Sequence, residues 1–203
     1  MALEEIVLKN EKSQHKYAAM SDGDLLIFMA AGQHEAYDVF AERYAAALNR
    51  LVYRLGFYGA ECEDMLQDIL VHLWQKAELW QRQQNISARS WIYRVATNLC
   101  IDVHRKNKRQ PVQTAMDIDI VPLEGTERSD YQSEQRERST YIKAALQTLS
   151  VRARQAITLV YYQEMTNKEA ADSMGISVKA IESLLVRGRK KLKKQLQHDQ
   201  EVI

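Results

Sequence analysis

Residues 166–192 read TNKEAADSMGISVKAIESLLVRGRKKL, and their spacing predicts two short helices joined by a tight turn. Thr166 and Glu169 have the T-x-x-E spacing of a capping box, which marks the start of a helix. Gly175 suits the turn, because glycine adopts backbone angles that other residues avoid. Ser177 can then cap the second helix. The stretch therefore has the organisation of a helix-turn-helix.

The second helix of this motif is expected to expose a basic face. Ile181, Leu184 and Leu185 recur at helical spacing and should point into the core. Between residues 179 and 194, seven cations oppose one carboxylate, a net charge of +6. Such a helix is typical of recognition helices, which enter the major groove and contact phosphates, although a plain helical hairpin with a solvated basic face is the simpler alternative. The residues expected to face DNA are Ser177, Val178, Lys179, Glu182, Ser183, Arg187, Arg189 and Lys190.

A second patterned segment, residues 61–78, predicts an amphipathic helix with an acidic face. Its apolar stripe is formed by Leu66, Ile69, Leu70, Leu73 and Trp74. Asp64, Gln67 and Asp68 share another face, and acids near a helix N-terminus are favoured by its dipole. The face could be simply solvated, or it could bind a protein partner. A nuclease metal site is a poor third alternative, because histidine partners and a second carboxylate cluster are missing.

A third segment, SWIYRVATNLCIDVHRKNKR at residues 90–109, combines an aromatic residue with a run of cations and a net charge of +4. On a helix its core stripe would be Ile92, Val95, Ala96, Leu99 and Val103. A neighbouring stripe and the basic end would hold Trp91, Arg94, Asn98, Asp102, Arg105, Lys106, Lys108 and Arg109. Cations that follow phosphates, beside an aromatic ring on which an unpaired base can stack, suit melted DNA. In the alternative, Trp91 belongs to the core and the cations form a solvated helix end.

The composition and the positions of glycine and proline divide the chain into helical blocks. Only 7 glycines and 2 prolines occur in 203 residues, which favours long helices. Both prolines lie at residues 110–139, a segment with seven carboxylates and a net negative charge that is expected to be a flexible linker. The predicted fold is all-α, with two helical domains joined by this acidic linker. The expected boundaries are an N-terminal extension at 1–20, a first domain at 21–109, a second at 140–195 and a tail at 196–203.

The remaining composition narrows the class of protein. Cys62 and Cys100 are far apart and lack ligand spacing, so neither a disulfide framework nor a metal site is expected, and both thiols should be packed or idle. No apolar run reaches the roughly 20 residues that span a bilayer, and residues 1–17 are too polar for a secretory signal. These features predict a cytoplasmic protein.

These pieces, in this order, resemble the extracytoplasmic function (ECF, group 4) sigma factors of bacterial RNA polymerase. Residues 23–44 look like the opening helices of the family's sigma-2 domain, and ECEDMLQDILVHLW, residues 61–74, looks like its polymerase-docking helix. Residues 90–109 look like the helix that melts the promoter and recognises the −10 element. Residues 146–192 look like the sigma-4 domain, which reads the −35 element.

The resemblance implies a set of partners and contacts. Core RNA polymerase would be bound through its β′ subunit by Asp64, Gln67 and Asp68, with Trp74 packed beneath, and through its β subunit by sigma-4. Promoter DNA would be bound at the −10 element by residues 90–109 and by the loop at 81–89, which would hold a flipped base. An anti-sigma factor is the further expected partner. The resemblance also implies no covalent chemistry, so no catalytic residue and no cofactor are expected, and neither are membrane insertion and a small-molecule substrate. The alternative function is a stand-alone helix-turn-helix repressor, which would be a dimer on a palindrome.

Overall fold

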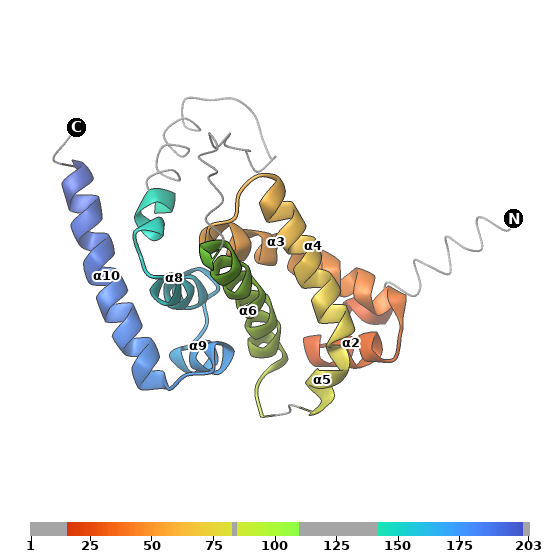
Figure 1. Ribbon diagram of the computed structural model, residues 1–203. Helices are drawn as coiled ribbons and strands as arrows, with labels where there is room; N and C mark the ends of the chain where they lie inside the picture. Colours follow the sequence, from red (N-terminus) through yellow and green to blue (C-terminus); the bar gives the residue numbers. More distant parts are fainter. Residues whose placement is uncertain (1–15, 83–84, 110–141, 201–203) are drawn as a thin grey trace, which may run out of the picture.

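The structure, a computed structural model, describes residues 16–82, 85–109 and 142–200, which form helices and connecting turns without any strand (Figure 1). The predicted linker at 110–139 and most of the predicted N-terminal extension lie outside these residues. Within the described residues the expectation of an all-α fold with two helical units is confirmed.

The first unit is a bundle built from the N-terminal half of the chain. Its helices are α2 (Asp22–Ala30), α3 (His34–Leu55), α4 (Ala60–Gln75), α5 (Ala77–Arg82) and α6 (Ala88–Arg109). Fully buried side chains from several of these helices form its core, including Leu25, Leu26, Phe40, Leu48, Ile69, Leu73 and Ile92. Burial of these apolar side chains is the main force that holds the bundle together.

Local signals in the sequence set the helix ends of the first unit. Ser21 caps α2, because its side chain accepts a hydrogen bond from the backbone N–H of Asp24 at 3.2 Å. Gly56 ends α3 with a φ of 105°, in the left-handed region that glycine favours. A Cβ at this position would lie 2.7 Å from Nη1 of Arg154, so glycine also leaves room for that guanidinium. Gly56 and Gly59 therefore bracket the turn between α3 and α4.

The second unit contains the helix-turn-helix. A short helical segment at 142–147 opens it, followed by α8 (Val151–Ile157), a π-helical turn η1 (Thr158–Tyr162), α9 (Asn167–Met174) and α10 (Val178–Gln200). The capping box of Thr166 and Glu169 is formed, and Gly175 adopts the left-handed conformation at the turn, with φ 62°. Ser177 Oγ accepts a hydrogen bond from the N–H of Ala180 at 3.2 Å. The predicted motif is thus confirmed, whereas the π-helical turn was not expected.

The two units pack against each other, with α6 between them (Figure 1). Helix α9 lies against α6, and α8 lies against the end of α3. The helix that was expected to present an open face to DNA is consequently covered on two sides. This arrangement decides how accessible each predicted binding residue is.

Candidate nucleic-acid and partner interfaces

The acidic face of α4 is open to solvent. Asp64, Gln67 and Asp68 are exposed, while Ile69 and Leu73 on the opposite side of the helix are completely buried. Neither aspartate forms an ion pair within the described residues. Val71 lies beside these residues with 47% of its surface exposed, an apolar side chain in a polar face. The face therefore combines unpaired carboxylates with an apolar contact, which suits binding to another macromolecule.

Trp74 lies at the edge of this face and is held by aromatic neighbours. Its ring stacks on His34 at 5.1 Å between centroids and meets Tyr37 edge-on at 5.3 Å. The side chain is partly buried and packs against the core. Trp74 thus joins the end of α4 to α3, and its expected place beneath a polymerase-binding face stays a prediction.

The position predicted for Trp91 is wrong. The sequence placed it on an outer stripe of α6 as a stacking platform, but only 2% of its surface is exposed. Its ring packs near Trp80 of α5, with 6.2 Å between ring centroids. Because α6 is central, apolar residues line more than one of its faces, and a single amphipathic stripe describes it poorly. In this structure Trp91 is a core residue and offers no face to a base.

Arg94 is engaged by the second unit. Its Nε donates a hydrogen bond to the backbone carbonyl of Asp172 at 2.9 Å, and its Nη2 donates to the same oxygen. That carbonyl lies in the last turn of α9, where it also accepts a long hydrogen bond from the Gly175 N–H at 3.4 Å and where the helix dipole favours a cation. The guanidinium expected to contact DNA thus caps a helix of the other unit.

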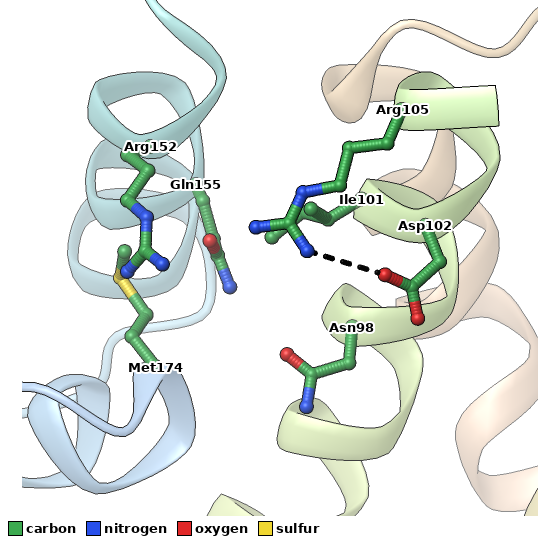
Figure 2. Close-up of a pocket in the computed structure, with 7 residues that line it drawn as sticks. All are labelled: Asn98, Ile101, Asp102, Arg105, Arg152, Gln155 and Met174. Carbon is green, nitrogen blue, oxygen red and sulfur yellow. Dashed lines mark ion pairs between the residues drawn. The ribbon is translucent and has the colours of Figure 1, made fainter. Parts of the chain in front are cut away.

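Asn98, Asp102, Arg105 and Lys106 are exposed, as expected of a binding face. Arg105 forms an ion pair with Asp102 at 3.5 Å, and both side chains are more than half exposed. A cavity of about 270 Å³ separates this part of α6 from the second unit (Figure 2). It is lined by Asn98, Ile101, Asp102, Arg105, Arg152, Gln155 and Met174. The side chains of Lys108 and Arg109 lie outside the described residues, although both belong to α6.

The predicted recognition face of α10 is open along its length. The residues named from the sequence are all exposed: Ser177, Val178, Lys179, Glu182, Ser183, Arg187, Arg189 and Lys190. Ile181 and Leu185 are buried on the opposite side, and Leu184 is partly buried. Gly188 allows a close approach to α8, since a Cβ there would lie 2.6 Å from Cδ1 of Ile157. The basic face is therefore fixed outward by a well-packed apolar side.

Glu182 stands alone on this basic face. Its nearest cations in the sequence at helical spacing are Lys179 and Arg189, and an ion pair with either would occupy the carboxylate. Among the described residues no such pair forms, and Arg187 instead donates to the backbone carbonyl of Ser183 at 3.2 Å. The Glu182 carboxylate is consequently available to a donor outside the chain.

The contacts between the units were not foreseen from the sequence. Tyr93 donates a hydrogen bond to Oε1 of Gln163 at 2.6 Å, and Arg89 donates to the backbone carbonyl of the same glutamine. Ser173, which is completely buried, donates to the carbonyl of Ser90 at 3.0 Å. Arg154 donates to the carbonyl of Leu55 at 3.0 Å, at the end of α3. These partners are 70 or more residues apart, so local sequence patterns carry no signal for them.

The two cysteines are buried, as the sequence predicted. Burial raises the pKa of Cys62 to about 11 and that of Cys100 to about 12, because a thiolate is poorly solvated there. The Cys62 thiol also donates to Oδ1 of Asn49 at 3.1 Å. No cluster of histidine, cysteine or carboxylate groups in the described part of the chain could hold a metal ion.

We expect neither thiol to react with iodoacetamide at neutral pH while the protein is folded. The thiolate is the reactive form, and the raised pKa of both groups leaves almost none of it. Mass spectrometry after a timed exposure should show unmodified protein, and two additions after denaturation in urea. Modification of the folded protein at the rate of a free thiol would show that one of these sites opens readily.

Comparison with known proteins gives the class of this fold. Residues 40–110 match the family model for sigma-70 region 2, and residues 139–192 match that for sigma-70 region 4. The RNA polymerase sigma factor NccH of Alcaligenes xylosoxydans xylosoxydans is 28% identical over 177 residues, which cover 84% of this chain and 92% of the relative. The ECF RNA polymerase sigma factor SigM of Mycobacterium tuberculosis H37Rv is 27% identical over 176 residues, covering 87% and 85%.

Solved structures share the fold. CnrH in complex with the cytosolic domain of CnrY has a TM-score of 0.63 and 24% identity, covering 88% of this chain and 98% of that one. The sigma factor RpoE in complex with the anti-sigma factor NepR from Bartonella quintana has a TM-score of 0.62 and 22% identity, covering 79% and 96%.

Regions 2 and 4 in one chain, in this order and on helices that pack as described, define a sigma factor. The chain belongs to the sigma-70 family. Within it, the relatives that carry the name ECF RNA polymerase sigma factor place the chain in the ECF class, whose members direct RNA polymerase to promoters at the start of transcription. Among its described helices, none has the length and apolar character to cross a membrane.

Proposed function

We propose that three faces of this chain bind the three partners needed for transcription initiation at a promoter. The acidic face of α4 binds core RNA polymerase, the polar face of α6 binds the −10 element, and the basic face of α10 reads the −35 element. One observation supports this division above all: Asp64, Asn98 and Lys190 are exposed on helices whose apolar sides are buried. The chain itself performs no covalent chemistry and acts in the bacterial cytoplasm.

The −10 face would have to separate from the second unit before it meets DNA. Arg94 is bound to Asp172 of α9, and Asn98 and Arg105 face α8 across the cavity. In our proposal, binding to polymerase replaces the contacts between the units, and Arg94 exchanges its carbonyl partner for DNA. Charge-assisted hydrogen bonds to phosphate oxygens are stronger than those to a neutral carbonyl, which favours the exchange.

An anti-sigma factor would hold the chain in its inactive state. The similar structures of CnrH and RpoE are complexes with CnrY and with the anti-sigma factor NepR, and this chain has the same fold. The packed arrangement of the two units leaves the α4 and α10 faces exposed and covers part of α6. A partner that stabilised this arrangement would keep the −10 face from DNA.

Run-off transcription with core RNA polymerase tests the proposed function. The purified chain, added to core enzyme and a promoter selected from a randomised pool, should produce a transcript of defined length. Core enzyme alone is the control. A stand-alone repressor would bind DNA but would give no transcript. That result, together with binding as a dimer to a palindromic site, would contradict our proposal.

Glu182 supplies a sharp test of the −35 interface. Its unpaired carboxylate is expected to accept a hydrogen bond from the N4 amino group of a cytosine. Glu182→Ala should therefore relax the preference at one C·G pair of the −35 element by about 1–3 kcal/mol, with other positions unchanged. The measurement is selection from a randomised −35 element followed by sequencing. An unchanged base profile would rule out direct readout by Glu182.

Lys190→Ala is the matched control for this experiment. Lys190 is exposed on the same helix and is expected to contact phosphate, which carries no sequence information. Its loss should weaken binding to all sequences alike and reduce the slope of log affinity against log salt by about 1. A base-specific effect of Lys190→Ala would mean that Lys190 contacts a base and not only a phosphate.

A further inference from the structure

We infer that the cavity between α6 and the second unit binds a small phosphorylated anion, such as inorganic phosphate or pyrophosphate. The cavity has a volume of about 270 Å³ and draws its walls from both units. In Figure 2, Arg105 extends from α6 toward the gap, and Arg152 and Gln155 approach it from α8. This inference goes beyond the proposed function, because neither polymerase nor promoter DNA is needed for such binding.

Two guanidinium groups from opposite walls give the cavity a positive charge. Arg152 has no carboxylate partner within the described residues, and Arg105 has only Asp102, at 3.5 Å. Both side chains of that pair are more than half exposed, so the pair is weak and leaves Arg105 donors free. Guanidinium groups present a planar fork of donors that fits the oxygens of a phosphoryl group.

Gln155 gives the second, independent observation. It is only 1% exposed, yet its Nε2 amide has no hydrogen-bond partner. Buried donors are almost always paired, because an unpaired one loses its water and gains nothing in return. The amide lies on the wall of the cavity, where an acceptor oxygen would satisfy it. Asn98 adds an amide on the opposite wall.

The size and lining of the cavity limit what can bind. Pockets for drug-sized ligands are usually about 300–1,000 Å³, so this one suits a smaller group. Ile101 and Met174 add apolar surface, while the polar groups that converge are mainly donors. A compact ligand with several acceptor oxygens and negative charge matches these donors. Asp102 is the one carboxylate in the lining, and Arg105 partly offsets its charge through their ion pair at 3.5 Å (Figure 2).

An anion in this position would bridge the two units. It would be bound by Arg105 and Asn98 from one unit and by Arg152 and Gln155 from the other, and so would stabilise them together. If the proposed −10 face is correct, the same anion would also occupy two of its residues. That consequence rests on the proposed function, whereas binding itself does not.

Isothermal titration of the full chain with inorganic pyrophosphate and with inorganic phosphate tests the inference, at constant ionic strength with sodium chloride as the baseline. We expect saturable binding of one pyrophosphate per chain. Arg152→Gln should weaken it about tenfold or more, since one charged donor is lost. The control is Lys168→Gln, which removes one exposed cation of the same unit away from the cavity and should leave binding unchanged. Absence of binding to the wild type, or equal losses in both variants, would overturn the inference.

Gln155→Met separates a binding role from a structural one. Methionine keeps the length of the side chain but removes the unpaired amide. Without anion, the variant should be at least as stable as the wild type, because an unsatisfied buried donor is gone. With pyrophosphate, it should gain less thermal stability than the wild type. A variant that gains as much would show that Gln155 takes no part.

Competition with DNA distinguishes the source of the phosphoryl group. A short single-stranded oligodeoxynucleotide should fail to displace pyrophosphate from the cavity while the units remain packed. If instead the oligonucleotide binds in an Arg152-dependent way and pyrophosphate does not, the cavity is part of the DNA interface and our inference is wrong. Both measurements are made without polymerase, so they are independent of the transcription test.

Discussion

Trp91→Ala is expected to lower the free energy of unfolding by about 3–5 kcal/mol, the usual cost of truncating a fully buried large aromatic residue. Trp91 is 2% exposed and lies against Trp80 within the core of the first unit. Alanine would leave a cavity that the surrounding helices can fill only in part. Urea denaturation followed by circular dichroism measures the loss. Trp91→Phe should recover much of it, because most of the apolar volume is kept.

A comparison with an exposed residue and a test on DNA complete this experiment. Val71→Ala, at a position that is 47% exposed, should change stability by less than about 0.5 kcal/mol. Transcription by Trp91→Ala, corrected for the folded fraction and divided by that of the wild type, should be the same from a duplex promoter as from a pre-melted promoter. A selective rescue by the pre-melted promoter, with stability nearly unchanged, would show that Trp91 leaves the core to stack on a base.

Trp91 illustrates where sequence reasoning fails in this chain. A periodic pattern predicts which face of a helix is apolar, and it succeeded for α4, where Ile69 and Leu73 are buried and Asp64 is exposed. Helix α4 has one covered side, so the pattern is simple. Helix α6 is covered by the first unit and by α9, and its buried residues therefore spread beyond one stripe. The position of α5, which brings Trp80 to Trp91, has no local signal.

The helix-turn-helix could be predicted more completely because each of its features is local. The capping box at Thr166, the turn at Gly175 and the cap at Ser177 involve partners within a few residues. Arg94 is the opposite case. Its carbonyl acceptor on Asp172 lies 78 residues away in the sequence. Because every residue has a backbone carbonyl, no residue type marks this one as the acceptor. The exposed faces of α4 and α10 were therefore predictable, whereas the contact that covers part of α6 was not.

The second large effect is expected on α4. The double variant Asp64→Ala, Gln67→Ala should weaken binding to core RNA polymerase by about 2 kcal/mol or more, roughly 30-fold, the size of effect that hot-spot residues at the centre of an interface give. Both side chains are exposed and are not needed for the fold of the free chain. Alanine is also the best helix former, so the helical circular dichroism signal should stay the same. Fluorescence anisotropy of labelled protein titrated with core enzyme measures the affinity.

A matched double variant separates this face from a general loss of polar surface. Gln33→Ala, Glu42→Ala also removes one amide and one carboxylate at exposed positions, and the Gln33 side chain makes no capping hydrogen bond to α3. It should bind core enzyme as the wild type does. Salt gives a further distinction, because an interfacial carboxylate contributes a screened electrostatic attraction. The affinity of the α4 variant should thus fall less steeply with salt than that of the wild type. If both double variants bind core enzyme equally well, α4 is not the docking helix.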